Sequence, residues 1–163
     1  MEQQEKTIAA SATTLSQIIL PSQTNPAGTA HGGELLKMMD NCAYACATKH
    51  ARAVVVTAGI DNIHFHAPIF MGNQAICKAH LCYVSNRSME IAVSIEAEDL
   101  MAGTKNCCMT AFFIFVALDE NMQPKQLDPL ILQNEIERQE FEAGKARMAV
   151  RKETPKLCWI SLY

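Results

Sequence analysis

The chain has 163 residues, with 14 lysines and arginines against 17 acidic residues and a formal net charge of −3. This length suffices for one domain with one sizeable core, and a composition of 49% hydrophobic and 19% charged residues excludes a largely disordered chain. The slight acidity argues against a general nucleic-acid binder, which would carry a basic stripe. So little charge on so small a protein predicts that apolar surface is buried between subunits.

The chain contains seven cysteines, an odd number with no CxxC pair. The first twenty residues lack the positive start and continuous apolar run of a signal peptide, and the longest apolar run, at 111–118, is far too short to span a bilayer. We therefore expect a cytoplasmic protein without a membrane partner, whose cysteines are reduced and packed as small hydrophobes. Cys42, Cys46 and His50 share one helix face, but no fourth ligand accompanies them, so core packing is favoured over a metal site.

The first third of the chain predicts a strand, a loop and a helix. Polar residues 1–11 predict a flexible start, and the β-branched segment 12–20 predicts a strand that ends at Pro21. A loop rich in glycine, proline and asparagine follows at 22–33. From 33 to about 49, polar positions recur every three or four residues between leucine, methionine, alanine and cysteine. This spacing predicts a helix that is buried around most of its circumference.

The rest of the chain predicts extended structure and then one more helix. Segments that are β-branched or alternate in polarity, separated by turn residues, predict strands at 54–60, 63–69, 74–84, 89–98 and 106–118. Charged residues with a thin apolar stripe predict a solvent-exposed helix over 130–152, and 153–163 form a tail. The predicted elements are, in order, one strand, one long helix, about four strands in a meander and a peripheral helix. This order predicts an α+β fold whose antiparallel sheet covers one helix.

Asp40 breaks the pattern of the predicted central helix. It lies about 85° from the centre of the polar stripe of that helix and is flanked by methionine, cysteine and alanine. In one interpretation, a carboxylate in this position is partly buried or lies at a subunit seam. In the other, it is an ordinary aspartate at the helix edge that reaches water or a lysine.

The loop before that helix, at 25–33, has three glycines within six residues. A ligand can approach exposed N–H groups closely there, although an ordinary turn and N-cap has the same composition. Asn25 adds a carboxamide donor, and amide donors of this kind polarise a carbonyl oxygen. We expect His31 to be structural, because a helix N-terminus disfavours its protonation. His64 and His66 face one side of a strand and are expected to be ordinary sheet-face histidines rather than ligands.

The segment N-P-A-G-T-A-H-G-G-E-L-L-K-M-M-D, at 25–40, resembles the signature of the hotdog-fold acyl-CoA thioesterases, the cytosolic acyl-CoA hydrolase group. Further similar segments follow in order at 55–58, 60–69, 71–72, 87–91 and 115–119, and the helix at 135–152 resembles the tail of that family. The resemblance implies a hotdog fold in a single domain over 12–152. In that fold an antiparallel sheet of about five strands wraps around a long central helix. It also implies a homo-oligomer of paired subunits, often with three dimers in a hexamer.

The resemblance also implies an activity and a site. The family hydrolyses fatty acyl-CoA to a free fatty acid and CoA without a metal or an organic cofactor. Its paired functional residues fall on Asn25 and Asp40, and its CoA-contacting turn falls on Asn86, Arg87 and Ser88. Family members commonly have a glycine and a small hydroxyl residue where Asn86 and Arg87 stand here, so this turn departs from the family pattern.

A mechanism fits these residues. Asn25 and an N–H from Gly32 or Gly33 would hold the thioester oxygen as negative charge develops on it. Asp40 would activate water as a general base or attack the carbonyl directly. Because Gly33 and Asp40 are about 10 Å apart along one straight helix, each site is expected to combine two chains.

Arg87, with Lys145 or Arg147, would contact the phosphates of CoA. Two other functions would require features that differ from those of this sequence. A hotdog enoyl-thioester hydratase has an aspartate two residues before Asn-Pro, where Gln23 stands here, and a histidine closer than His31. A non-catalytic acyl-CoA sensor usually carries a DNA-binding domain, for which the first 11 residues give no room.

Overall fold

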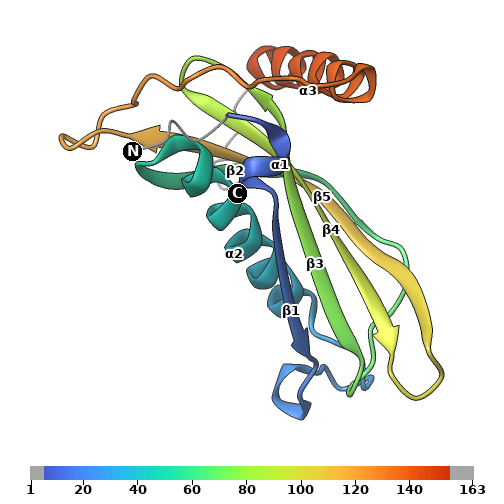
Figure 1. The fold of residues 1–163 in the computed structure, drawn as a ribbon. Helices are drawn as coiled ribbons and strands as arrows, with labels where there is room; N and C mark the ends of the chain where they lie inside the picture. Colours follow the sequence, from blue (N-terminus) through green and yellow to red (C-terminus); the bar gives the residue numbers. More distant parts are fainter. Residues whose placement is uncertain (1–5, 155–163) are drawn as a thin grey trace.

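The computed structural model describes residues 6–154, which form one sheet with a helix on each face (Figure 1). The elements in chain order are α1 (Ile8–Ser11), β1 (Thr13–Ile18), the 3-10 turn η1 (Pro21–Gln23), α2 (Gly32–Ala51), β2 (Val54–Phe65), β3 (Gln74–Val84), β4 (Ser88–Asp99), β5 (Thr104–Leu118) and α3 (Glu135–Glu153).

The five strands pair antiparallel in the order β1-β3-β4-β5-β2. Strands β3 to β5 form the expected meander. Strand β2 does not join it at β3 but crosses to the far edge and pairs with β5. The expected segment 54–60 and the first three residues of the one at 63–69 form this single strand, and residues 66–69 lie outside it. Register shifts between Thr57 and Gly59 and between Asp61 and His64 break the alternation of the strand. The predicted α+β class and five-stranded antiparallel sheet are confirmed.

Helix α2 lies against the inner face of the sheet, as the sequence predicted (Figure 1). The side chains that make this contact are small or apolar and fully buried: Met39, Cys42, Ala43, Cys46 and Ala47. They pack in one core with sheet residues such as Leu81, Ile91 and Phe113. The cysteines of this helix therefore act as small hydrophobes, and within residues 6–154 they do not gather with His50 as metal ligands.

Helix α3 packs on the opposite face of the sheet, across β3. Most of its surface is exposed, as expected, and the side that contacts the sheet combines a buried ionic network with a few apolar contacts, those of Phe141 on Tyr83 and of the buried Met148. Glu90 of β4 is fully buried there and binds both Arg147 and Arg151. Gly144 allows this close approach, because a Cβ at that position would lie 2.7 Å from the Cβ of Tyr83.

Residues 6–11 are ordered, unlike the flexible segment expected at 1–11, whose first five residues lie outside the described residues. Residues 8–11 form helix α1, in which Ile8 and Ser11 are buried, and Thr7 caps the helix by accepting from the Ala10 N–H. Backbone pairing of Thr7 with Ile131 and an ion pair of Lys6 with Asp128 attach this segment to the domain. At the other end, α3 stops at Glu153, so nearly all of the tail expected at 153–163 lies outside the described residues. No helix between residues 6 and 154 is long and apolar enough to cross a membrane.

Candidate active site

The loop before α2 holds Asn25 in a fixed orientation. The Asn25 Oδ1 accepts from the backbone N–H groups of Ala27 (3.0 Å) and Thr29 (3.2 Å), and its Nδ2 donates to the Thr29 Oγ1 (3.0 Å). The loop is anchored in turn by the Ala30 N–H, which donates to the Ile69 carbonyl over 2.7 Å. A carboxamide nitrogen has two hydrogens, so one Nδ2 hydrogen of Asn25 is left for a ligand.

The first turn of α2 distinguishes the two glycines that the sequence left equivalent. His31 caps the helix, and its Nδ1 accepts from the Gly33 N–H over 3.1 Å. His31 is therefore structural, as expected. The Gly32 N–H has no acceptor among residues 6–154, so Gly32 is the better oxyanion donor of the two. A Cβ on Gly32 would lie 3.3 Å from the Phe65 ring, which leaves little room for a side chain.

Asn25 and Gly32 line one cavity of about 360 Å³, together with Phe65, His66 and apolar residues that include Leu35 and Ile69. The structure thus brings together the carboxamide and the helix N-terminus that the sequence singled out. A carbonyl oxygen bound there would meet one side-chain donor and one backbone donor.

Asp40 lies apart from this cavity, in the middle of α2. It is partly buried, and its Oδ1 accepts from the Thr57 Oγ1 of β2 over 2.7 Å. This hydrogen bond orients the carboxylate toward the sheet edge that β2 forms. Sequence reasoning did not select Thr57 as a site residue, because a threonine inside a β-branched run is the usual composition of a strand. Asp40 and Gly32 are about 12 Å apart along the helix. Within one subunit, the two groups are therefore too far apart to contact the same atom.

The edge strand β2 is unusually apolar for an exposed edge. Its partly or largely exposed side chains are those of Val54, Val56, Ile60, Ile63 and Phe65, with 37–58% of each residue accessible. Within the described part of the chain, β5 is the only strand that pairs with it. An apolar strand edge of this kind is a template for pairing with another chain. Asp40 and Thr57 therefore lie beside the surface best suited to contact a second subunit.

The turn expected to contact CoA joins β3 to β4. Asn86 and Arg87 are exposed, Ser88 is half-buried, and the turn is closed by Ser85, whose backbone N–H donates to the Ser88 carbonyl over 2.8 Å. Loop 25–31 contacts residues 69–70, just before β3 begins, so the turn and the loop lie at opposite ends of β3. Eleven residues of strand separate them by about 35 Å.

The two basic residues of α3 that were expected near CoA have different surroundings. Lys145 is largely exposed, and its only ion pair among residues 6–154 is with Glu142, one turn away. Arg147 donates to the Glu90 Oε1 from Nε (3.0 Å) and Nη2 (2.6 Å) and lies over the Phe112 ring. The charge of Arg147 is therefore already balanced by a buried carboxylate. The expected contact of Arg147 with a CoA phosphate stays a prediction.

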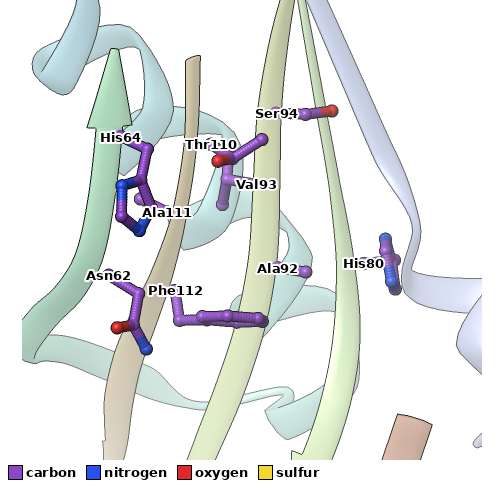
Figure 2. A pocket seen from close by; sticks show the side chains of 9 residues that line it. All are labelled: Asn62, His64, His80, Ala92, Val93, Ser94, Thr110, Ala111 and Phe112. Atoms are coloured by element: carbon purple, nitrogen blue, oxygen red, sulfur yellow. The ribbon is translucent and has the colours of Figure 1, made fainter. Parts of the chain in front are cut away.

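A second cavity, of about 380 Å³, opens on the outer face of the sheet, away from Asn25 and Asp40 (Figure 2). It is lined by residues of four strands, among them Asn62, His64, His80 and Phe112. His64 stacks on His66 with ring centroids 6.0 Å apart, and the His66 Nε2 contacts the Thr110 Oγ1 at 2.9 Å. Among the described residues, His64 and His66 are not part of a group of metal-ligand side chains.

The fold and the position of these groups agree with the comparisons to known proteins. The model of the thioesterase superfamily matches residues 27–104, and an uncharacterised acyl-CoA thioester hydrolase of Bacillus subtilis is 33% identical over 119 residues, which cover 73% of this chain and 69% of that protein. The chain belongs to the thioesterase superfamily. Its sheet wrapped around α2 is therefore a hotdog fold, as the resemblance implied.

Other members extend the comparison. The cytosolic acyl coenzyme A thioester hydrolase of Mus musculus is 32% identical over 143 residues, which cover 86% of this chain. The chain spans 38% of the length of that relative. A crystal structure of an apo-hexameric acyl-CoA thioesterase superposes with a TM-score of 0.87 at 31% identity, covering 92% of this chain and 96% of that one.

Structures of an acyl-CoA hydrolase from Staphylococcus aureus are also similar. One, in complex with butyryl coenzyme A and coenzyme A, is 29% identical with a TM-score of 0.82 and covers 90% of this chain and 89% of that one. Three others carry alanine in place of an asparagine, an aspartate and a threonine. These three positions are spaced by fifteen and seventeen residues, which is also the spacing of Asn25, Asp40 and Thr57.

Proposed function

We propose that this chain is an acyl-CoA thioesterase that hydrolyses fatty acyl-CoA to a free fatty acid and CoA. The observation that carries the proposal is the pair of donor and carboxylate groups on α2: the Asn25 and Gly32 amides at its N-terminus, and Asp40 bound to Thr57 in its middle. These are the groups that acyl transfer requires, an oxyanion site and a base or nucleophile. Membership of the thioesterase superfamily and the spacing shared with the Staphylococcus aureus variants support it.

The Asn25 Nδ2 and the Gly32 N–H would stabilise the oxygen of the thioester carbonyl as it becomes negatively charged. Asn25 is suited to this because its own Oδ1 is held by two backbone N–H groups, which fixes the carboxamide before the substrate arrives. The acyl chain would lie against the apolar residues of α2 and the sheet, which continue from Leu35 into the core.

Asp40 would activate a water molecule as a general base or attack the carbonyl carbon to form an anhydride. Thr57 would act as a positioning residue, because its hydroxyl holds one carboxylate oxygen and leaves the other free for water or substrate. Both routes release CoA as a thiol and need neither a metal nor an organic cofactor.

Each active site would be built from two chains. Within one subunit, Gly32 and Asp40 lie about 12 Å apart along α2. Both groups must nevertheless contact one carbonyl, each within roughly 3–4 Å. A two-fold axis with antiparallel α2 helices sets the N-terminus of one helix against the middle of the other. The exposed apolar edge of β2 supports this homodimer, and the hexameric relative supports a trimer of such dimers.

The same two-fold arrangement would bring the β3–β4 turn of one subunit toward loop 25–31 of the other. Asn86, Arg87 and Ser88, with Lys145 of α3, would then contact the phosphates of CoA. Arg87 supports this role, since it is exposed and has no ion pair within residues 6–154. We also propose a cytoplasmic location, in keeping with the cytosolic mouse relative and with the six described cysteines, all of which are free.

Release of free thiol from acyl-CoAs of varied chain length tests the proposed reaction. We expect turnover with at least one chain length. Binding of acyl-CoA without any thiol release would overturn the hydrolase and favour an acyl-CoA sensor, and hydration of an enoyl-CoA without thiol release would favour a hydratase.

Mixed dimers test the shared site. Asn25→Ala and Asp40→Ala chains, each nearly inactive alone, are refolded together in equal amounts. Half of the dimers are then mixed and half of their sites are intact, so about a quarter of the wild-type turnover per chain should return. No recovery in mixed dimers verified by mass would show that Asn25 and Asp40 act within one subunit.

A further inference from the structure

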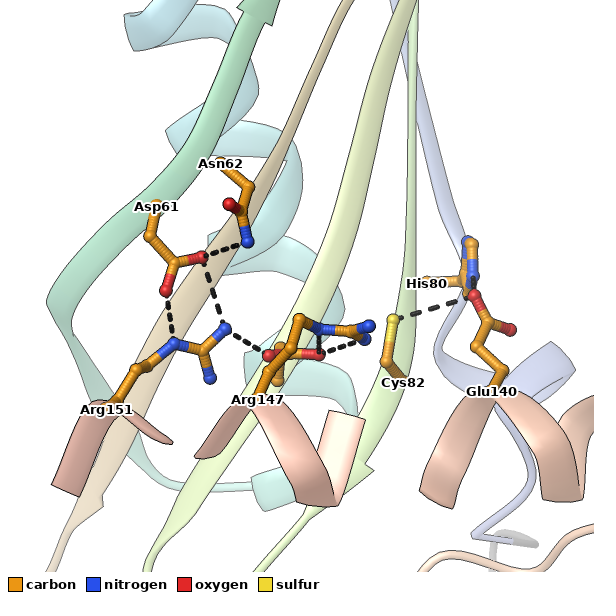
Figure 3. Close-up of polar contacts among 8 residues, drawn as sticks. Asp61, Asn62, His80, Cys82, Glu140, Arg147 and Arg151 are labelled. Carbon is orange, nitrogen blue, oxygen red and sulfur yellow. Dashed lines mark hydrogen bonds and ion pairs between the residues drawn. The ribbon is translucent and has the colours of Figure 1, made fainter. Parts of the chain in front are cut away.

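Three side chains of different ligand types meet between β3 and α3 on the outer face of the sheet (Figure 3). The His80 Nε2 lies 2.7 Å from the Glu140 Oε1, and the Cys82 Sγ lies 3.7 Å from the same oxygen. One donor atom from each residue falls within 4.8 Å of the other two. This cluster lies outside the proposed active site, which lies on the other face of the sheet.

The strand geometry presents these groups to α3. His80 and Cys82 are two residues apart on β3, so their side chains share a face. Directly after Cys82 the register with β4 shifts, and Cys82 itself faces no residue of that strand. The bulge brings Tyr83 to the same face, where its ring packs at 4.8 Å on Phe141. This contact fixes the turn of α3 that carries Glu140 over both side chains.

The two distances from the Glu140 Oε1 are close to those around a small tetrahedral ion, and the third pair, His80 nitrogen and Cys82 sulfur, lies within 4.8 Å. Zinc bonds of 2.0–2.3 Å to nitrogen, oxygen and sulfur set the donor atoms about 3.3–3.8 Å apart. The sulfur-to-oxygen distance of 3.7 Å already has this value, and the nitrogen-to-oxygen pair needs to open by roughly half an ångström. His80 and Glu140 keep about a third of their side chains exposed, so an ion can enter from solvent. His80 also lines the outer-face cavity of Figure 2.

The charges of the cluster also suit a cation. Cys82 is fully buried, and its Sγ lies beside the Glu140 carboxylate. A divalent metal binds a cysteine as thiolate, so it would take the place of the thiol proton and balance the carboxylate charge at the same time.

We propose that His80, Cys82 and Glu140 bind one divalent transition metal of the zinc class, with a water molecule as fourth ligand, and so clamp α3 onto β3. One imidazole, one thiolate and one carboxylate favour zinc over magnesium or calcium, which prefer oxygen ligands only. The site is structural or regulatory, and its metal takes no part in the proposed hydrolysis.

The test is a zinc titration of the full chain against a chromophoric chelator. We expect one zinc ion per chain. The affinity for zinc should fall at least about a hundredfold in Cys82→Ser, His80→Gln and Glu140→Gln. Loss of a residue that only hydrogen-bonds to a metal ligand costs less affinity than this. The matched controls are Cys107→Ser, an exposed thiol, His64→Gln, and Glu142→Gln, an exposed carboxylate on the same helix. Affinity in Cys82→Ser equal to that in Cys107→Ser would overturn the site.

Two measurements on the wild-type chain do not depend on whether a variant folds. Cobalt bound at this site should give a thiolate-to-metal charge-transfer band, because Cys82 supplies sulfur. Zinc should also slow hydrogen exchange in α3 and leave α2 unchanged, because α3 carries the ligand Glu140 and α2 carries none of the three. A cobalt complex without a thiolate band, or no change in the exchange of α3, would contradict the proposal.

Discussion

The two long helices of this domain have nearly the same length but are held in different ways. Helix α2 has 20 residues, nine of which are buried, and it contacts the sheet through apolar side chains and thiols. Helix α3 has 19 residues, of which only Gly144 and Met148 are buried, and it is held by Glu90, Arg147 and Arg151. One helix is thus fixed by hydrophobic burial and the other by a buried ionic network.

This difference matches what each helix does in the proposed enzyme. Apolar burial along its sheet-facing side makes α2 a rigid support, which suits the Gly32 amide and the Asp40 carboxylate that must meet the reacting carbonyl. An ionic network depends strongly on geometry, because each buried charge must keep its partner. Helix α3 is therefore fixed at one position on the sheet by a few named contacts, and single substitutions can release it without touching the core.

The largest effect is expected from Glu90→Ala. It leaves Arg147 and Arg151 without their buried partner, and removing one side of a buried ion pair costs about 3–5 kcal/mol. The free energy of unfolding should fall by that amount in urea titrations, and hydrogen exchange should increase in α3 more than in α2. The control is Glu96→Ala on the same strand, whose partly exposed pair with Lys78 should cost no more than about 1 kcal/mol. Equal costs would show that the network does not hold α3.

Asp40→Asn should lower kcat at least about a hundredfold, which is about 2.7 kcal/mol of lost transition-state stabilisation. The amide keeps the shape of the carboxylate and its contact with Thr57, so the oligomer and its stability should stay unchanged. Thiol release and urea titration measure the two effects separately. Asn41→Ala, at the exposed neighbouring position, is the control. Activity of Asp40→Asn within a few-fold of wild type would exclude Asp40 as base or nucleophile.

Gly144→Ala tests the contact of α3 from its other side. The added Cβ would meet the Tyr83 Cβ at 2.7 Å and the Glu90 Oε1 at 3.0 Å, so the helix must move away from the sheet. We expect a loss of about 1–3 kcal/mol from this overpacking, partly offset by the better helix propensity of alanine. Lys145→Ala, on the exposed side of the same turn, should change stability by less than about 0.5 kcal/mol. An unchanged or raised stability of Gly144→Ala would contradict the close approach.

Arg87→Ala should raise KM about tenfold and leave kcat nearly unchanged, because phosphate contacts are equal in the ground and transition states. The KM of the wild type should also rise with salt, and that of the variant should rise less. Arg138→Ala, an exposed arginine paired with Glu135 within α3, is the control. A defect confined to kcat would show that this turn orients the carbonyl instead of binding CoA.

The smallest effect concerns pH and the end of α2. His50 is buried, its Nε2 contacts the Asp128 carbonyl at 3.1 Å, and its Nδ1 has no partner within residues 6–154. Burial lowers the pKa of His50 below its ordinary 6.5, so the unfolded chain binds the proton more readily than the folded one. Stability should be complete above pH 6.5 and should fall as the pH drops below it. His50→Gln should flatten this dependence in urea titrations at several pH values, whereas His64→Gln should not.

The sequence predicted α2 better than α3, and the physical reason is the same difference between the helices. The spacing of apolar residues is a local property of the sequence, so the buried helix at 33–49 and the strands could be identified from that spacing alone. The ionic contact joins Glu90 to residues 57 and 61 positions later in the chain, and no local pattern shows such a pairing. Arg147 was therefore expected to face CoA, although it faces the sheet.

The residues of the proposed site differ in the same way in how far the sequence predicts them. Asn25 and Asp40 could be predicted from a contiguous segment that resembles a known family. Thr57, the choice of Gly32 over Gly33, and the cluster of His80, Cys82 and Glu140 depend on contacts across the fold. The crossing of β2 to the far edge of the sheet is another long-range feature, since a strand pattern does not specify its neighbour.

The exposed edge of β2 has a consequence for how the protein is made in a cell. The strand has twelve residues, no proline, and a single charged side chain, that of Asp61, which is bound to Arg151. Its two register shifts apart, it therefore lacks the proline and the free charges that usually prevent an edge strand from joining foreign β-structure. In the proposed homodimer, a newly synthesised subunit that remains single would be at risk of aggregation, so its yield would depend on how quickly it meets a second copy.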